Sequence, residues 1–345
     1  MLTEDWMIPQ EKNGAVARAL EAAFGVKTCD DIRLLKGGAG KRSDLIFCMI
    51  VKGSPYLLRI VKRTNDPACH FTCMKIAAEG GLAPHVWFSS VEDGVCITDF
   101  VEAEPVSRKE ALVRMAGVLR KLHALPPFPG RADHLNTSCT FLLNKGPALD
   151  ELVRSFQSAD LVPKKEGERF LSRYTELAAA YERNSSDMVS CHNDLVKRDN
   201  VLFNGDRVWL VDWEAAFLND RYADLAVVAN FVANTDEEET RFLERYFGRL
   251  PDELERARFF LMRQVAHMFY AIANLLMGAA SKPANWSEPV PGFEQFHERI
   301  WAGEINPWDK EMKTIYGQVH WKRLQENMEL PRFDEAVRTV LEPRA

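Results

Sequence analysis

The sequence predicts an α+β protein with two lobes, a β-rich lobe of residues 1–101 and a larger, mostly helical lobe of residues 102–345. Three observations predict this division. Runs of β-forming residues gather before Val101, and long helical patterns dominate from Ser107 onward. One stretch that is rich in strand and turn residues, Met188–Trp213, interrupts the helical half. A chain of 345 residues is long enough for two lobes with separate cores.

The first lobe is predicted to begin with a helix and continue into a small sheet. Residues Asn13–Phe24 have helical periodicity, with Asn13 as the expected N-cap. Two runs of β-formers follow, Leu45–Val51 and Tyr56–Val61, and the sequence Lys-Gly-Ser-Pro joins them. This turn chemistry between two apolar runs predicts a β-hairpin.

The remaining elements alternate between short strands and longer helices. Residues His70–Glu79 have helical periodicity and stop at two glycines, and Val95–Phe100 is an apolar strand candidate. In the second lobe, Lys109–Ala124 ends at a cluster of prolines and Glu166–Arg183 forms another long helix. The first lobe is therefore expected to hold one sheet with one main helix, ahead of a short hinge.

A hairpin is predicted inside the strand-rich stretch of the second lobe. Asn204 and Gly205 both tolerate positive φ, and their twist suits two antiparallel strands. Residues Val201–Phe203 are therefore expected to pair with Arg207–Val211.

Composition and charge exclude several classes of function. The chain is 46% apolar and 27% charged, as in ordinary globular proteins, and its formal net charge of −6 gives no support for nucleic acid or an anionic membrane as a partner. Residues Met1–Lys12 lack a long apolar run, so no signal peptide is expected. Residues Phe259–Ala280 are apolar but include Arg263, Gln264 and His267, which favours a buried helix over a membrane span.

The cysteines indicate a reducing compartment and no structural zinc. Seven scattered cysteines are typical of a cytoplasmic protein without disulfides. Cys69, His70 and Cys73 lie close together, but a zinc site needs about four ligands and no second Cys/His pair is nearby. We therefore expect a soluble cytoplasmic protein.

A glycine-rich loop, Gly37–Arg42, precedes the first hairpin. It is not a P-loop, because Leu35 stands where that motif needs a glycine and Arg42 stands where it needs Ser or Thr. The element that follows is a strand, and so no helix N-terminus is available to hold phosphate. The loop can instead lay backbone N–H groups over nucleotide phosphates, with Gly38, Gly40 and Lys41 in contact, or it can be a plain hairpin turn.

The strongest chemical signal lies between His192 and Glu214. Phosphoryl transfer needs a carboxylate that orients the attacking hydroxyl and accepts its proton, together with oxygen ligands for magnesium. Asp194 in a loop, Asn200 before a strand and Asp212 across the hairpin bring such groups to one edge. The alternative, that both aspartates are ordinary turn residues, fits poorly with the apolar residues around them.

These residues resemble a known family. His192-x-Asp194-Leu195 is similar to the catalytic loop, and Val211-Asp212-Trp213-Glu214 to the metal-binding motif, of the aminoglycoside phosphotransferase and choline-ethanolamine kinase superfamily. Asn219-Asp220, followed by Asp224-Leu225-Ala226, resembles its bacterial choline-kinase-like branch. The resemblance implies a bilobal protein-kinase-like fold with ATP and Mg²⁺ in the cleft between the lobes.

The resemblance also implies roles for individual residues. Arg59 stands where the family keeps a basic residue facing the ATP phosphates. Asp99 and Val101 are implied to offer hinge backbone groups to the adenine. Asp194 is implied to be the catalytic base, and His192 to hold the loop.

Asn200 and Asp212 are the implied magnesium ligands, although the spacing departs from the family pattern. The family places its asparagine five residues after the catalytic aspartate, whereas Asn200 is six after Asp194 and Asp199 takes the usual position. Because Asn200 directly precedes a strand, we predict that Asn200 points into the cleft beside Asp212 and that Asp199 turns outward or pairs with a nearby base.

A second departure concerns Arg59. Kinases pair the basic residue of the third strand with a helix glutamate. The expected place falls near His70, and residues Phe71 to Ala78 contain no carboxylate. The sequence does not show what orients Arg59.

The substrate is expected to be a small hydroxyl compound. Trp213 and Glu214 could line its pocket, and Glu214 could attract a cation such as choline, ethanolamine or an aminoglycoside. Choline kinases carry a pair of tryptophans on a late helix, whereas the matching helix here has Phe269 and Tyr270, so the identity of the substrate does not carry over from the family.

The alternative function is a non-catalytic pseudokinase that binds nucleotide or a protein. A protein kinase is disfavoured, because no Asp-Phe-Gly or Ala-Pro-Glu signature is present.

Overall fold

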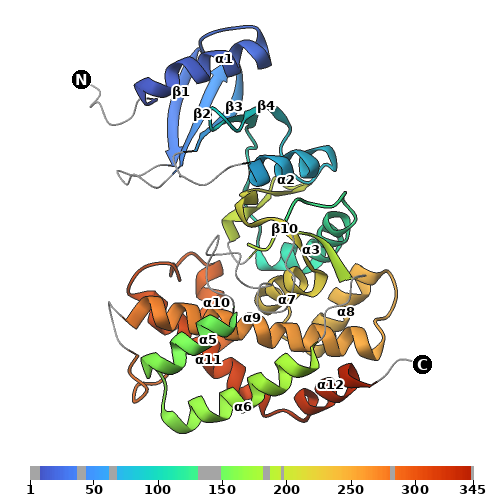
Figure 1. The fold of residues 1–345 in the computed structure, drawn as a ribbon. Coiled ribbons are helices and arrows are strands. Elements are labelled where there is room, and N and C mark those ends of the chain that lie inside the picture. The colour runs from blue at the N-terminus through green and yellow to red at the C-terminus, as the bar shows by residue number, and fades with distance from the viewer. Residues whose placement is uncertain are drawn as a thin grey trace.

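The computed structural model describes residues 8–36, 44–61, 68–130, 149–181, 187–195, 198–279 and 284–342. Figure 1 shows a small lobe built around a sheet above a larger lobe built mostly from helices. The predicted α+β organisation, with a β-rich first part and a helical second part, is confirmed. The lobe boundary at residue 101 stays a prediction.

The small lobe contains one antiparallel five-stranded sheet with the strand order β1-β2-β3-β5-β4. Its strands are β1 (Asp31–Lys36), β2 (Leu45–Val51), β3 (Ser54–Ile60), β4 (Val86–Ser90) and β5 (Val95–Asp99). The predicted hairpin is β2–β3, and its turn uses positive φ at Lys52 and Gly53. Burial of alternate residues of β2 and β3 against a helix gives this lobe its own core.

That covering helix is α1 (Asn13–Phe24), whose buried residues Ala15, Val16, Ala19 and Leu20 contact the sheet. It ends at Gly25 with φ 71°, a left-handed conformation that glycine adopts without strain. The expectation that Asn13 caps the helix is wrong. A 3₁₀ turn, Gln10–Lys12, runs directly into α1, so Asn13 already lies inside the helical stretch. The second helix of this lobe is α2 (Ala68–Glu79).

The large lobe is built around one long helix, α9 (Glu253–Ala279). Among the described residues, it is the one helix long and apolar enough to cross a membrane, and 89% of its most apolar stretch is buried inside the protein. This agrees with the predicted buried helix. The other helices are α3 (Arg108–His123), α5 (Leu149–Ala159), α6 (Lys164–Ala180), α7 (Arg221–Val232), α8 (Asp236–Phe247), α10 (Phe293–Trp301), α11 (Met312–Met328) and α12 (Pro331–Leu341).

Two small sheets lie between the lobes and position the candidate site. β6 (Glu104–Pro105), β8 (Val201–Phe203) and β9 (Val208–Leu210) form one, and β7 (Met188–Cys191) pairs with β10 (Phe217–Asp220) in the other. The predicted hairpin around Asn204-Gly205 is confirmed as β8–β9, with Val201 opposite Leu210. Asp194 follows β7, Asn200 precedes β8 and Asp212 follows β9, so the two sheets bring the ends of all three segments together.

Candidate active site

The buried carboxylate of Asp224 fixes the backbone of the loop that follows β7. Asp224 on α7 accepts the backbone N–H groups of His192 and Asn193, each at 2.8 Å. His192 donates from Nε2 to the carbonyl of Val211 at 3.0 Å, which ties the loop to the segment before Asp212. Asn193 has φ 63°, a left-handed conformation that asparagine tolerates better than most residues. The carboxylate of Asp194 is therefore carried on a backbone whose direction is fixed by neighbouring elements.

Asn200 lies against Asp194. Its side-chain Nδ2 donates to the carbonyl of Asp194 at 2.8 Å and to the Asp194 carboxylate at 3.2 Å. Asn200 is 4% exposed, whereas its neighbour Asp199 is exposed to solvent. Asn200 is therefore turned inward against Asp194, whereas the side chain of Asp199 meets solvent. The role of Asn200 as a metal ligand stays a prediction.

Asp212 begins the turn after β9 in a left-handed conformation, with φ 68° and ψ 62°. Its Oδ1 lies 3.2 Å from Nη2 of Arg59, which comes from β3 of the small lobe. The pair therefore joins β3 of the small lobe to the turn after β9 in the large lobe.

Arg59 is surrounded by carboxylates from both lobes. Besides Asp212, its guanidinium contacts Asp44 at 2.9 Å and forms a close ion pair with Glu214. Burial lowers the pKa of Arg59, but the charges of Asp212, Glu214 and Asp44 outweigh that effect and raise the pKa above its ordinary value. The guanidinium thus stays charged in a largely buried position. A group that remains cationic between the lobes can bind phosphate.

The other residues predicted to bind the nucleotide are Gly38, Gly40, Lys41, Asp99 and Val101. Gly38, Gly40 and Lys41 lie outside the described residues. Asp99 ends β5, and its carboxylate accepts the indole N–H of Trp87 at 2.7 Å. Val101 follows in the connection to the large lobe, where it is half-buried.

Trp213 is a core residue in this structure. It is 1% exposed, its Nε1 donates to the carbonyl of Leu210 at 3.2 Å, and its ring packs against His192 with centroids 4.7 Å apart. This burial leaves the indole no surface for a substrate, contrary to what the sequence suggested. The carboxylate of Glu214, the next residue, pairs with Arg59.

Comparison with known proteins now adds to this geometry. Residues 53–260 match the model of the phosphotransferase enzyme family. The chain belongs to this family. The match covers both Arg59 and the whole segment from His192 to Glu214, and the predicted resemblance is confirmed.

Individual relatives of this phosphotransferase are distant. Protein LicA of Haemophilus influenzae is 32% identical over 101 residues, which is 28% of each chain. A choline/ethanolamine kinase family protein from Mesorhizobium loti has a similar fold, with a TM-score of 0.62 at 20% identity over 96% of this chain and 99% of that one. Spectinomycin phosphotransferase bound to ADP and spectinomycin gives a TM-score of 0.51 at 14% identity over 89% and 98% of the two chains. These likenesses confirm the bilobal kinase-like fold. The chain spans less than a third of the length of the curated relatives it matches.

An apolar pocket of about 30 Å³ in this phosphotransferase lies beside the loop that carries Asp194. Leu195, which follows Asp194, forms one wall, and Trp301 at the end of α10 and Phe231 on α7 contribute aromatic rings. All ten lining residues are apolar, the others being Val106, Ala111, Met115, Val201, Val228, Val232 and Ile300. Sequence reasoning missed Trp301, because nothing local links a tryptophan on α10 to a loop more than 100 residues earlier.

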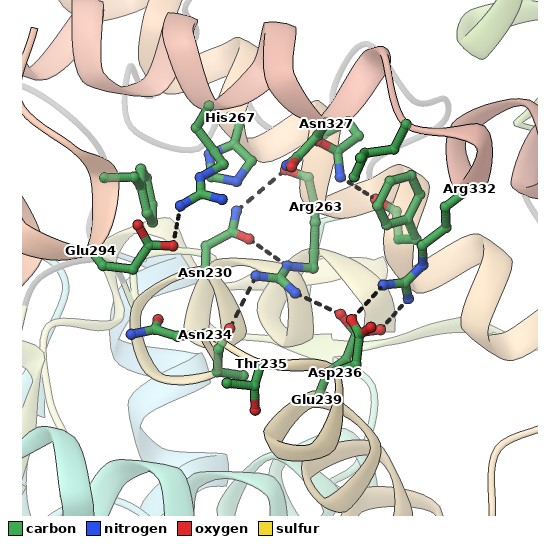
Figure 2. A pocket seen from close by; sticks show the side chains of 16 residues that line it. Asn230, Asn234, Thr235, Asp236, Glu239, Arg263, His267, Glu294, Asn327 and Arg332 are labelled. Carbon is green, nitrogen blue, oxygen red and sulfur yellow. Dashed lines mark hydrogen bonds and ion pairs between the residues drawn. The ribbon is translucent and has the colours of Figure 1, made fainter.

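A second, polar pocket of about 170 Å³ lies among the helices of the large lobe (Figure 2). Arg263 crosses it and donates to Glu239 at 2.6 Å and to Asn230 at 2.7 Å, while Arg332 pairs with Glu239 from the other side. This hydrogen bond and these ion pairs link α7, α8, α9 and α12. The pocket contains none of the residues predicted for the active site.

Proposed function

We propose that this protein is an ATP- and magnesium-dependent phosphotransferase that phosphorylates the hydroxyl group of a small amino alcohol such as choline or ethanolamine. One observation carries the proposal. Asp194 and Asn200 are in direct contact at the edge where Arg59 and Asp212 join the lobes. Membership of the phosphotransferase family supports it.

The reaction assigns one task to each group. Asp194 orients the acceptor hydroxyl and takes its proton as the hydroxyl oxygen bonds to the γ-phosphorus and the bond to ADP breaks. Arg59 balances the charge of the phosphates, assisted by the backbone of Gly38 and Gly40 and by Lys41. The backbone at Asp99 and Val101 holds the adenine.

The donor set fits magnesium. Asp212 supplies a carboxylate and Asn200 an amide oxygen, and Mg²⁺ prefers hard oxygen ligands. Because Nδ2 of Asn200 is used by Asp194, the amide oxygen is the atom that Asn200 offers to a cation. When bound, Mg²⁺ neutralises phosphate charge.

The pocket at Leu195 favours an amino alcohol over an aminoglycoside. Its wholly apolar lining suits the methyl groups of a quaternary ammonium ion such as that of choline, and the Trp301 and Phe231 rings can stabilise the cation. Such a lining would leave the many hydroxyl and amino groups of an aminoglycoside, and also the primary ammonium of ethanolamine, without hydrogen bonds, so among the amino alcohols the pocket favours choline. Glu214, paired with Arg59, is assigned to the phosphate side of the cleft instead of the acceptor side.

The cysteines are consistent with action in the cytoplasm, where ATP is available. Six of them are described, and all six are free thiols. Burial raises the pKa of Cys96 to about 12, so that thiol stays protonated and unreactive. We propose a cytoplasmic location on this basis.

The test is ATP consumption against choline, ethanolamine and several aminoglycosides, with native protein and Trp301→Leu. We expect turnover with an amino alcohol, and a KM for it that rises about tenfold in Trp301→Leu while ATP affinity is unchanged. Trp286→Leu, a tryptophan in a loop outside the pocket, is the matched control. Turnover with aminoglycosides alone would refute the acceptor class, and ATP binding without any transfer would indicate a pseudokinase.

A further inference from the structure

Arg59 lacks the usual helix partner. In protein kinases a glutamate on the helix pairs with the basic residue of the third strand. Here His70 on α2 takes that place, with its Nε2 3.3 Å from Nη1 of Arg59. Arginine can only donate hydrogen bonds, so Nε2 of His70 must accept and the ring contributes no negative charge. A carboxylate for Arg59 has to come from another element.

Asp44 supplies that carboxylate from the position directly before β2, the strand that pairs with β3. Its Oδ2 lies 2.9 Å from both Nε and Nη2 of Arg59. Arg59 pairs with Ile46 across the β2–β3 ladder, and Asp44 stands two residues before Ile46. Side chains on a strand alternate between faces, so residues two apart share a face. Asp44 lies one residue outside the ladder, and the same alternation continued past Leu45 puts its side chain on the face of Arg59, in agreement with the 2.9 Å contact.

The contact between Asp44 and Arg59 is buried and lies within one lobe. The side chain of Asp44 is 6% exposed and that of Arg59 12%. A charge-assisted hydrogen bond is strongest where water is excluded. The other two carboxylates, Asp212 and Glu214, come from the large lobe, so those contacts change if the lobes move or if phosphates draw Arg59 away. The bond to Asp44 can persist through both events.

We propose that Asp44 is a positioning residue that aims Arg59 at the nucleotide phosphates, in place of the helix glutamate, with His70 supporting the opposite edge of the guanidinium. This inference rests on the proposed function. Without Asp44, the carboxylate partners of the guanidinium among the described residues are Asp212 and Glu214 of the large lobe, and the guanidinium turns toward them.

The experiment measures the dissociation constants of ATP with Mg²⁺ and of adenosine, which lacks phosphates. Four chains are compared: native, Asp44→Asn, Arg59→Ala and the double variant. We expect Asp44→Asn to weaken ATP binding on the order of tenfold and to leave adenosine binding unchanged. In the Arg59→Ala background, Asp44→Asn should have no further effect, because Asp44 acts through Arg59.

Two further variants control for structural damage. Asp93→Asn removes a carboxylate from a surface ion pair with Arg18 in the same lobe and should change neither constant. Moving the carboxylate to the helix, with Asp44→Ala and His70→Glu together, should restore most of the ATP affinity that Asp44→Ala alone loses. If Asp44→Asn does not fold, Asp44→Glu takes its place, since it displaces the carboxylate by one methylene.

The outcomes separate this inference from the proposed function. If Arg59→Ala weakens ATP binding but Asp44→Asn does not, or if the two effects add, the positioning role of Asp44 is refuted alone. If Arg59→Ala leaves ATP affinity unchanged, the phosphate role of Arg59 fails, and the inference fails with it. Equal losses for ATP and adenosine in Asp44→Asn would show a merely structural role.

Discussion

The side chain of Asn200 donates to both the carbonyl and the carboxylate of Asp194, at 2.8 Å and 3.2 Å. The segment between these residues is one residue longer than the family spacing, yet the asparagine reaches the catalytic loop. Val211 donates its backbone N–H to the carbonyl of Asn200 at 3.0 Å, which anchors Asn200 to the strand end beside Asp212. Position relative to the strand, and not spacing, decides which residue points inward.

This relationship predicts different effects for two adjacent substitutions. Asn200→Ala removes both the hydrogen bonds to Asp194 and the amide oxygen offered to magnesium, and kcat should fall roughly 100-fold or more. Asp199→Ala alters an exposed side chain, and kcat should stay within about twofold of native. Steady-state kinetics of the two variants checks this. A larger loss in Asp199→Ala than in Asn200→Ala would show that spacing was the better guide.

Asp212 is expected to account for the magnesium dependence of ATP binding. ATP at about 100 times its dissociation constant stabilises a folded protein by about 2.7 kcal/mol. With Asp212→Ala, the part of this stabilisation that requires Mg²⁺ should disappear. Thermal unfolding with ATP, with and without Mg²⁺, measures it. Asp206→Ala, an exposed aspartate in the β8–β9 turn, is the control. An unchanged magnesium effect in Asp212→Ala would refute the role.

Asp224 is expected to contribute stability that depends on pH. Burial raises the pKa of this carboxyl, but the hydrogen bond and charge of His123 and the interactions with His192 outweigh burial and hold the pKa below its ordinary value of 3.8. Because the pKa of Asp224 is lower in the folded state than in the unfolded state, its charge stabilises the fold at pH values above 3.8. This stabilisation is lost as the pH falls from 3.8 through the lowered pKa of the folded state. Asp224→Asn removes a buried charge that accepts two backbone N–H groups and should cost about 3–5 kcal/mol at pH 7.

Urea unfolding between pH 7 and pH 3 checks this prediction. The native protein should lose stability toward the acid end, and Asp224→Asn should lose less, because the titrating group is gone. Asp206→Asn, with an exposed side chain, should follow the native curve. Parallel curves for native protein and Asp224→Asn would contradict the account.

Local chemistry made parts of the fold predictable. The Asn204-Gly205 turn fixed the β8–β9 hairpin, since only a few residue pairs match the twist of such strands. Polar residues within α9 marked it as a core helix because each would be costly in lipid. The cap of α1 was missed, because a 3₁₀ turn that merges with a helix leaves no distinct sequence signal.

The site was predictable only where its residues share one segment. Asp194, Asn200 and Asp212 lie within one short stretch of chain, and the hairpin brings them together. The burial of Trp213 and the pairing of Glu214 with Arg59 depend on contacts with distant segments, which the local sequence does not reveal. Asp44 reaches the site because β2 pairs with β3, and Trp301 reaches it because α10 packs near the loop of Asp194. Both are tertiary contacts, which the local sequence does not show.

The central claim is that Asp194 accepts the proton of an alcohol during phosphoryl transfer from ATP. The most direct measurement is formation of the phosphorylated amino alcohol by native protein and Asp194→Asn, with ATP affinity determined for both. We predict that Asp194→Asn lowers kcat by roughly 100- to 10,000-fold while its ATP affinity stays close to native. Near-native turnover in Asp194→Asn would contradict the claim.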